Sequence, residues 1–424
     1  MKHRTHPVRI NQGNNHTDKD TSQNNAPSSS DYHEVIENVL ILQGGGSLGA
    51  FACGVFKALV KNNIKIDIVA GTSIGGVNAS IIAGSKEDHP EKALEQFWLE
   101  LAEGDINSNS YPFTNWLSDG LTNSLTSVVD HTRNSHGSQI KSLSSFYKSA
   151  FSGNNKVFIP RWNPKYAFND PEYFNPNKWT YLYDHSPLIK TLEKYLDFNK
   201  LQPNGNPNSR LIITAVNVLT AEPLAFDSSK EQITLKHLLA ATAYPKYYFQ
   251  WVEVEKGVYA WDGSLLSNTP LREVIEASPI KNKRVFLVEN YPKKIHNLPD
   301  NLFEVEHRTR DILFSDKTMH NIKMSKAFTI YLKLIADLYN MLENNFNLKN
   351  KEDINKFERI RKRYKRISEN HGAEIKETYY ITREEKDSSH LYENADFSPK
   401  ALKDSIREGE MKTKQIVDEI TKNM

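Results

Sequence analysis

Two short strand-like segments, each ending in a glycine-rich turn, most constrain the fold of this chain. Residues 39–42 are aliphatic and lead into the turn GGGSLG at residues 44–49, and residues 64–70 lead into GTSIGG at residues 71–76. After each turn apolar residues recur at helical spacing, so each unit is predicted to be strand, turn and helix. This order favours an α/β fold with a parallel sheet covered on both faces.

The 424 residues suffice for one large domain and a smaller part. Residues 1–36 are polar and predict a disordered leader. Residues 37–295 hold the expected strands and helices, with an insertion at residues 104–207 rich in Ser, Asn, Tyr and Pro. Residues 296–424 are charged and predict a helical extension, with one apolar stripe over 327–343. We expect a three-layer α/β/α domain with a mostly parallel sheet, followed by a C-terminal helical region.

Composition excludes several classes of protein. The 54 Lys and Arg nearly balance the 52 Asp and Glu, so no global charge favours a nucleic-acid partner. Cys53 is the single cysteine of the sequence, which excludes an intrachain disulfide or a multi-cysteine zinc site, and we expect a buried side chain there. No run of 18 apolar residues predicts a membrane-spanning helix.

Ser73 occupies the centre of Gly-x-Ser-x-Gly at a predicted turn from strand to helix. Such a turn lifts a serine hydroxyl out of the sheet, and the flanking Gly71 and Gly75 relieve crowding. A serine hydroxyl is a weak nucleophile and needs a base within hydrogen-bonding reach. The alternative is a tight turn in which Thr72 or Ser73 only caps the helix.

The glycine turn that begins 29 residues before Ser73 supplies a matching function. Acyl transfer builds negative charge on a carbonyl oxygen, which preorganised backbone N–H groups stabilise. The turn follows a predicted strand, so its amides are expected at the same carboxyl edge of the sheet as Ser73. The candidate oxyanion hole therefore consists of Gly44, Gly45, Gly46 and Ile74.

Gly44, Gly46 and Gly49 also match the G-x-G-x-x-G pattern of dinucleotide-binding folds. That pattern expects an acidic residue at the end of the second strand. The nearest candidate, Asp67, lies 18 residues after Gly49, but three more strand residues follow it. A nucleotide site would also leave Ser73 unexplained, so it is the weaker interpretation.

Asp262 is the candidate base. It ends a predicted strand at residues 258–261 and begins the turn Asp262-Gly263-Ser264. A free aspartate has a pKa of about 3.9, and burial beside apolar residues would raise that pKa and strengthen the base. The alternative is an ordinary Asp-Gly turn, which is common in proteins.

Together these segments resemble the patatin-like phospholipases. That family combines a glycine-rich oxyanion loop, Gly-x-Ser-x-Gly and a late Asp-Gly-Gly or Asp-Gly-Ala, and uses a Ser–Asp dyad without histidine. The resemblance spans roughly residues 38–290 and includes GVFKAL (54–59), AVNV (215–218) and DGSLLSNTPL (262–271). It implies Ser73 as nucleophile and Asp262 as base, Gly49, Gly71, Gly75 and Gly263 as supporting glycines, and no metal or cofactor.

The chain departs from the family pattern at two positions. Many members carry Arg or Lys within the glycine loop, where this chain has Ser47 and Leu48, and Ser264 replaces the last Gly or Ala of the aspartate motif. Neither change removes a catalytic group. The first could alter how the oxyanion loop is held or which head group is tolerated.

A Ser-Asp-His triad is the alternative chemistry. In α/β-hydrolases the order along the chain is Ser, acid, His, and the oxyanion strand lies much further upstream. His307 and His320 follow Asp262 but fall in a charged helical region, and His237 is expected to cap or pack a helix. We therefore expect these three histidines to be structural.

The expected activity is hydrolysis of lipid acyl esters by a serine enzyme of the lipase or phospholipase A type. Alternatives that stay open are a polyester or thioester substrate, acyl transfer to an acceptor other than water, and a non-catalytic lipid-binding or membrane-scaffold protein on the same fold. The sequence does not decide head group, acyl length, cleavage position or oligomeric state.

Two segments suggest contact with lipid. The aromatic residues of 162–183 are expected in the core, with a lipid-facing cover as the alternative. The basic run at residues 356–366 is either a solvated helix face or a site of attraction to anionic lipid, worth about 1 kcal/mol per charge near such a surface. The expected location is cytoplasmic with peripheral membrane contact, and the polar leader leaves export by a non-standard route open.

Overall fold

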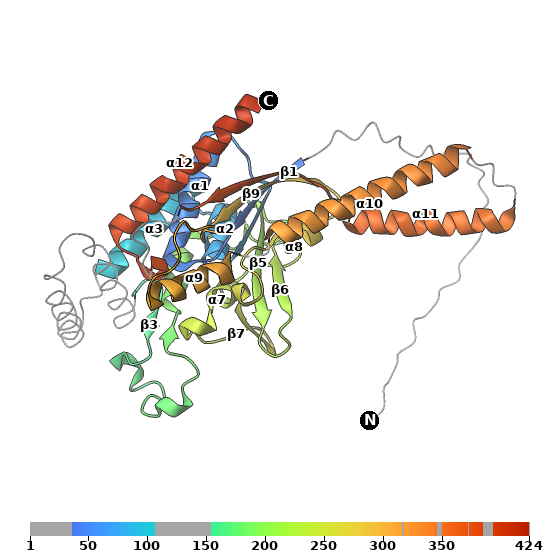
Figure 1. Ribbon diagram of the computed structural model, residues 1–424. Coiled ribbons are helices and arrows are strands. Elements are labelled where there is room, and N and C mark those ends of the chain that lie inside the picture. Colours follow the sequence, from blue (N-terminus) through green and yellow to red (C-terminus); the bar gives the residue numbers. More distant parts are fainter. Residues whose placement is uncertain are drawn as a thin grey trace, which may run out of the picture. The chain divides into compact units, whose positions relative to one another are not determined.

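A mixed sheet of eight strands lies at the centre of the part of the chain that the computed structural model describes (Figure 1). That part comprises residues 36–106, 154–315, 318–345, 350–371, 373–384 and 393–423, and the predicted leader falls outside it apart from Ile36. The strand order is β10-β9-β1-β2-β5-β8-β7, and β6 pairs with β5. The bounds are β1 (Ile36–Leu42), β2 (Ile68–Thr72), β5 (Arg210–Asn217), β6 (Pro223–Asp227), β7 (Val252–Glu255), β8 (Val258–Asp262), β9 (Asn282–Glu289) and β10 (Ile375–Thr382).

The strands from β10 to β5 run parallel, and β6, β7 and β8 are antiparallel to their neighbours. Successive strand residues point to opposite faces. Leu40 and Leu42 therefore pack into one apolar cluster, and Val39 and Ile41 into another that includes Leu271. Because both faces of the central strands are buried, helices must cover both, and the predicted three-layer α/β/α fold is confirmed.

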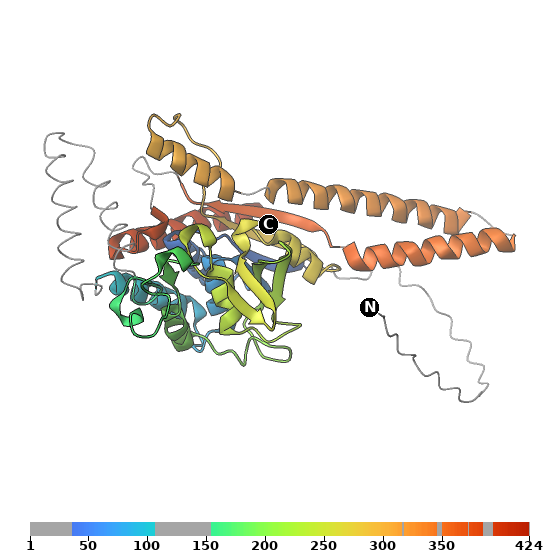
Figure 2. The ribbon, with the colours of Figure 1, turned by 90° about the horizontal axis from the view of Figure 1, so that it is seen from below.

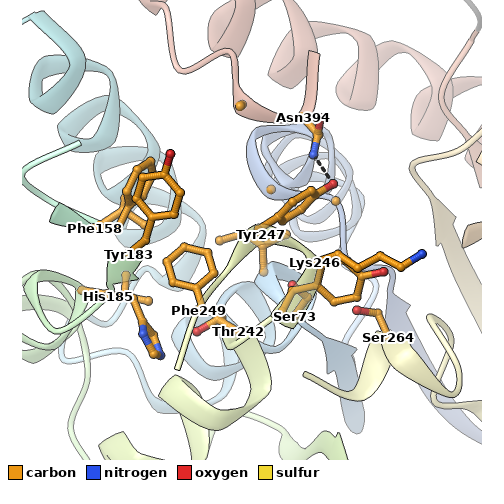
Figure 3. A pocket seen from close by; sticks show the side chains of 18 of the residues that line it. Ser73, Phe158, Tyr183, His185, Thr242, Lys246, Tyr247, Phe249, Ser264 and Asn394 are labelled. Atoms are coloured by element: carbon orange, nitrogen blue, oxygen red, sulfur yellow. Dashed lines mark hydrogen bonds between the residues drawn. The ribbon is translucent and has the colours of Figure 1, made fainter. Parts of the chain in front are cut away.

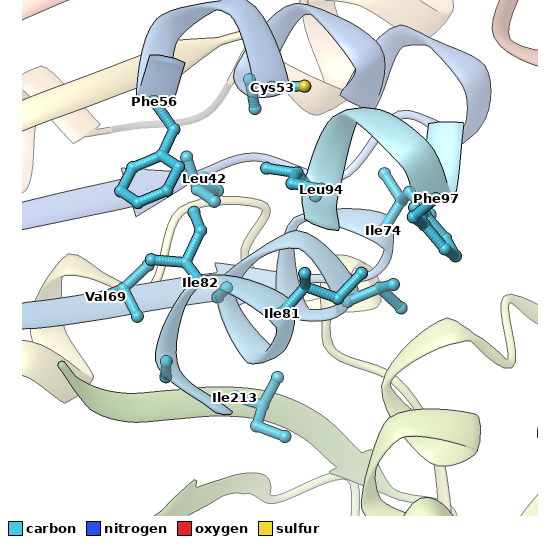
Figure 4. Close-up of a cluster of buried hydrophobic side chains, with 14 of the residues drawn as sticks. Leu42, Cys53, Phe56, Val69, Ile74, Ile81, Ile82, Leu94, Phe97 and Ile213 are labelled. Carbon is cyan, nitrogen blue, oxygen red and sulfur yellow. The ribbon is translucent and has the colours of Figure 1, made fainter. Parts of the chain in front are cut away.

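The first cluster lies between the sheet and helices α1, α2 and α3 (Figure 4), and α12 adds Leu402, Ile406 and Val417 to it. Cys53 is buried in it as predicted, and burial raises the pKa of its thiol. The second cluster contains residues of α8 and α10. The helices are α1 (Ala50–Lys61), α2 (Ile74–Gly84), α3 (Pro90–Ile106), α6 (Pro187–Tyr195), α7 (Leu235–Thr242), α8 (Leu271–Ala277), α9 (Leu302–Phe314), α10 (Thr318–Asn345), α11 (Lys351–His371) and α12 (Pro399–Asn423).

The C-terminal region does more than extend the fold with helices. Strand β10 adds to the sheet beside β9, and α12 packs against α1 and α3. The sequence analysis did not predict β10, because this strand mixes apolar residues with charged and polar ones and has no aliphatic run. That composition suits an edge strand, on which Glu377 can pair with Arg284 at 2.6 Å.

Residues 104–106 of the predicted insertion belong to α3, and residues 107–153 lie outside the described ranges. The remaining residues of the insertion are 154–207. They contain the short antiparallel pair β3 (Ile159–Pro160) and β4 (Tyr183–Asp184), followed by α6. Arg161 stacks over Trp179 and Tyr181, with its guanidinium 5.0 and 4.5 Å from the ring centroids. The prediction that the aromatic residues of 162–183 lie in the core is wrong, because Phe168 and Phe174 are exposed and the other aromatic side chains of this range are only half-buried.

No helix within the described ranges combines the length and the apolar character needed to cross a membrane.

Candidate active site

Ser73 sits at the sharp turn between β2 and α2. Its backbone has φ 56° and ψ −131°, a left-handed conformation that a serine adopts only under constraint from its surroundings. Residues before and after it are buried, whereas Ser73 itself lines an open cavity. The turn therefore presents the hydroxyl at the carboxyl end of the sheet.

Asp262 reaches the same place because β2 and β8 share one edge of β5. Thr72, the last residue of β2, pairs with Thr214, and Asp262, the last residue of β8, pairs with Ala215. Strand β6 pairs with β5 at both of these positions, so it occupies the opposite edge. The two strands run toward each other along β5 and end on adjacent residues, which brings Ser73 and Asp262 together.

The Asp262 carboxyl group is fully buried. Its Oδ1 accepts hydrogen bonds from the Ser264 amide at 2.9 Å and hydroxyl at 2.6 Å. Its Oδ2 is also buried and accepts no hydrogen bond of standard geometry from the described residues. Burial raises the pKa to about 6, against smaller lowering effects of Ser264 and of the Ser73 hydroxyl. Ser73 thus lies close enough to favour the ionised carboxylate.

The glycine loop approaches Ser73 from β1. A side chain at Gly44 would place its Cβ 2.7 Å from the Cβ of Ser73, so only glycine fits there. The Gly44 amide donates to Asn268 Oδ1 at 3.0 Å and is already engaged. Among the described residues, no hydrogen bond uses the amides of Gly45 and Gly46, which line the same cavity.

Two asparagines that the sequence analysis did not single out hold this loop. Asn290 Nδ2 donates to the carbonyls of Gln43 and Gly44 at 3.0 and 3.1 Å. Asn268 accepts from Gly44 and donates to the Phe314 carbonyl at 3.2 Å. Asn268 lies inside the motif at 262–271, so its spacing from Asp262 was a usable signal. Asn290 carries no such signal, because it follows β9 far along the chain.

The four supporting glycines of the motifs are all tightly packed. A Cβ at any of them would come within 2.8 Å of a neighbouring atom: Gly49, Gly71, Gly75 and Gly263.

A cavity of about 400 Å³ opens beside Ser73. Figure 3 shows Ser73 between an aromatic end with Phe158 and Phe249 and a polar end with Lys246 and Ser264. Further side chains of α3, α6 and the insertion line the cavity: Leu101, Val157, Tyr183 and Leu188. Lys246 is exposed, and no Asp or Glu of the described ranges lines the cavity. The cavity therefore suits a ligand with a long apolar part and a neutral or anionic head.

Of the three histidines considered for a triad, His237 and His307 have structural contacts. His237 accepts from the Thr234 amide at 3.3 Å, stacks on Phe226, and has its pKa lowered to about 4 by burial. It caps α7, as predicted. His307 lies near Asp311 and Glu393, and the side chain of His320 is outside the described residues. The described ranges contain no group of three or more His, Cys, Asp or Glu placed to hold a metal ion.

Asp67 lies at the wrong end of the sheet for a nucleotide. It precedes β2, which begins at Ile68 rather than at the predicted residue 64, and its Oδ2 accepts from the Asn38 amide at 2.9 Å. The glycine loop follows the opposite, carboxyl end of β1. This placement argues against the dinucleotide interpretation.

Comparison with known proteins gives a consistent family. The model of the patatin-like phospholipase family matches residues 40–275. The chain is 35% identical over 69 residues to triacylglycerol lipase SDP1L of Arabidopsis thaliana, which covers 16% of this chain and 9% of that protein. It is 40% identical over 63 residues to lysophospholipase nte1 of Aspergillus terreus, covering 13% and 4%. The chain thus matches only a small part of the length of these relatives.

Among solved structures, the chain is similar to VipD from Legionella pneumophila, with a TM-score of 0.38 and 16% sequence identity over 91% of this chain and 67% of that one.

We predict that Asp262→Asn stabilises the fold at neutral pH. The pKa of this carboxyl group rises from 3.8 to about 6 on folding, so the folded protein holds this proton more tightly than the unfolded chain does. This preference stabilises the fold fully below about pH 4, and the stabilisation is lost as the pH rises through 6. Removing the charge should raise the free energy of unfolding by on the order of 3 kcal/mol at pH 8 and by little at pH 4. Urea unfolding at both pH values measures this difference.

Asp227→Asn is the matched control. Arg210 donates to both Asp227 oxygens, at 2.9 and 2.5 Å, and this pairing outweighs burial and lowers the pKa. This variant should lose stability at pH 8, where the ionised pair contributes, and less at low pH. An Asp262→Asn protein that also loses stability at pH 8 would contradict the unpaired state of the Asp262 carboxylate.

Proposed function

The chain belongs to the patatin-like phospholipase family, and we propose that it is a serine acyl hydrolase that cleaves lipid acyl esters with a Ser73–Asp262 dyad. One observation carries the proposal. A buried carboxyl group with a raised pKa, one oxygen of which accepts no standard hydrogen bond from the described residues, ends its strand beside a half-buried, strained serine that lines the cavity. Such a pair is costly to maintain and is the arrangement that a nucleophile and its base require.

Ser73 Oγ attacks the acyl carbonyl while Asp262 accepts its proton. With a pKa of about 6, the carboxyl group is ionised at pH 7 and is a stronger base than an ordinary aspartate. The proton then passes to the leaving alcohol as the ester bond breaks, which leaves an acyl-enzyme. Water attacks that ester as it gives a proton to Asp262, and the fatty acid leaves as the proton passes to Ser73 Oγ.

The negative charge on the carbonyl oxygen is stabilised by the amides of Gly45, Gly46 and Ile74. Within the described ranges no group accepts a hydrogen bond from the amides of Gly45 and Gly46, which line the cavity, and Ile74 is the first residue of α2. Loss of one such donor typically lowers kcat by about 100- to 1,000-fold. Gly44, whose amide is engaged by Asn268, contributes the space that the substrate carbonyl needs beside Ser73.

The alternatives differ from this proposal in measurable ways. A non-catalytic lipid-binding or scaffold protein on the same fold would not turn over an ester. An acyl hydrolase of polyesters or thioesters, or an acyltransferase, would use the same dyad with another acceptor or leaving group. Product analysis from a mixed-lipid extract separates these possibilities.

Ser73→Ala is predicted to abolish ester hydrolysis, by roughly a thousandfold or more in kcat, and labelling by a fluorophosphonate. Ser80→Ala, which removes a buried hydroxyl from α2, the helix that follows Ser73, should leave both unchanged. In the wild-type protein, kcat/KM should fall about tenfold for each pH unit below 6, because protonated Asp262 is no base. A chromogenic short-chain ester measures all three, and equal rates for wild type and Ser73→Ala would end the enzymatic proposal.

Lys246 is proposed to favour substrates with an anionic head group. It is the cationic residue among the described cavity-lining residues, and no described carboxylate forms an ion pair with it. The acyl chain would extend toward the aromatic end while the head group lies near Lys246 and Ser264 (Figure 3).

We predict that Lys246→Gln lowers kcat/KM for a lysophospholipid with an anionic head by about fivefold, because a partly exposed ion pair contributes about 1 kcal/mol. Turnover of a monoacylglycerol with the same acyl chain should not change. Lys236→Gln, an exposed lysine that does not line the cavity, is the control. An equal loss on both lipids would contradict a role in head-group selection.

Helices α10 and α11 are proposed to contact anionic membranes. Tyr339 of α10 stacks on Phe357 and Tyr364 of α11, which joins the two helices. Apolar side chains of α10 remain exposed: Met324, Ile330, Tyr331, Leu334, Leu338 and Met341. Exposed cations at helical spacing share one face of α11 and form no ion pair with a described residue: Arg359, Lys362, Arg363 and Arg366. An apolar surface with unpaired cations suits an anionic lipid surface.

Exchanging Arg359, Lys362 and Arg366 together for Gln is predicted to weaken binding to vesicles that contain phosphatidylserine by more than about tenfold, since each charge contributes about 1 kcal/mol. The control exchanges Lys356, Arg361 and Lys365 for Gln, because these cations already pair within α11. Sedimentation with vesicles measures binding. Equal losses in the two variants would indicate only a general effect of net charge and contradict the site.

A further inference from the structure

The 3-10 turn η6 (Glu393–Ala395), from the C-terminal region, lies directly against the glycine loop. Ser47 Oγ donates to the Glu393 carbonyl at 2.7 Å. The backbones also meet, because a Cβ at Gly46 would lie 2.1 Å from the carbonyl oxygen of Asn394. On the far side, Asn394 Nδ2 donates to the Tyr247 hydroxyl at 2.6 Å (Figure 3). The turn therefore bridges the loop and the rim of the cavity.

Glu393 is itself held firmly by cations. Its Oε1 accepts from Arg383 at 2.6 Å and from Arg310 at 3.1 Å, and His307 Nε2 lies 3.3 Å away. Burial alone would raise the pKa of Glu393, but these neighbours hold it well below its usual range. The carboxylate is thus ionised at neutral pH, and its contacts anchor the residue whose carbonyl accepts from Ser47.

Glu393 is also connected to the glycine loop through Arg383. Arg383 Nε donates to the Asn290 carbonyl at 3.0 Å. Asn290 in turn holds the carbonyls of Gln43 and Gly44. Glu393 therefore joins two paths, one through Ser47 at the end of the loop and one through Arg383 and Asn290 at its start. The loop amides between these points are fixed from both sides.

This network explains the departure of the loop from the family pattern. Where many relatives place Arg or Lys, this chain has Ser47 and Leu48. The cations near the loop come instead from α9 and from the residue after β10, as Arg310 and Arg383. We propose that Ser47 and Glu393 are positioning residues, through which the C-terminal region holds the oxyanion loop in its working geometry. The inference rests on the proposed hydrolase function.

A positioning role predicts a specific kinetic signature. The oxyanion amides act on charge that develops in the transition state, so a displaced loop lowers kcat more than it raises KM. The lower limb of the pH profile should stay in place, because Asp262 does not take part in the network. A residue that only stabilises the fold would change neither parameter below the unfolding temperature.

The test compares Ser47→Ala with Ser209→Ala in the full chain. Both serines are buried, and each hydroxyl donates to a backbone carbonyl, at 2.7 and 2.8 Å, but Ser209 bonds Ile66 away from the cavity. We expect Ser47→Ala to lower kcat on a short-chain p-nitrophenyl ester by about 10- to 100-fold with KM within about twofold. Ser209→Ala should keep the wild-type kcat. Glu393→Gln should resemble Ser47→Ala, and Glu393→Asp should recover part of the loss.

Hydrogen exchange of the peptide covering residues 44–49 provides a readout that does not depend on activity. Faster exchange in Ser47→Ala but not in Ser209→Ala is expected. Unchanged exchange, or equal kcat in the two variants, would overturn the proposal. If the wild-type protein hydrolyses no ester but Ser47→Ala still exchanges faster than wild type, the anchoring is supported and the hydrolase function is overturned. The two failures are therefore distinguishable.

Discussion

The edge of β5 that β2 and β8 share is the constraint on which the site depends. The backbone hydrogen bonds of the sheet set the register of both strands, so the residue after β2 and the last residue of β8 meet with little freedom. Strand β1 runs parallel to β2, so the glycine loop that follows β1 lies at the same carboxyl end of the sheet as Ser73. The entropy cost of assembling distant groups is thus offset by the burial that builds the core.

This arrangement places unfavourable interactions where chemistry needs them. Ser73 has a left-handed backbone, and the Asp262 carboxylate is buried with one oxygen that accepts no standard hydrogen bond among the described residues. Elsewhere in the core a buried charge is fully paired: Lys283, with no exposed surface on its side chain, bonds Glu37 at 2.8 Å. Lys283 thus has a charged partner, whereas the carboxylate beside Ser73, the candidate nucleophile, has none among the described residues, which is the kind of unfavourable environment that functional sites contain.

Local patterns predicted much of the site. The strand-turn-helix units around residues 44–49 and 71–76 could be read directly, because short apolar runs, glycines and helical spacing are encoded within about 20 neighbouring residues. Asn290, Arg383 and Glu393 could not, because each acts on the glycine loop across the fold from a segment without a motif. Strand β10 was missed for a related reason: an edge strand with charged residues owes its conformation to pairing with β9 and not to its own composition.

The sequence by itself determined the chemical groups and their local geometry: a serine on a glycine-flanked turn, a run of glycine amides after a strand, and an aspartate at a strand end. Only the tertiary structure decided which amides remain available, that the Asp262 carboxyl group is buried enough to raise its pKa, and that the C-terminal region holds the loop. The physical reason is that residue type and neighbouring residues set conformational preference, whereas desolvation and long-range hydrogen bonding depend on which distant segments pack together.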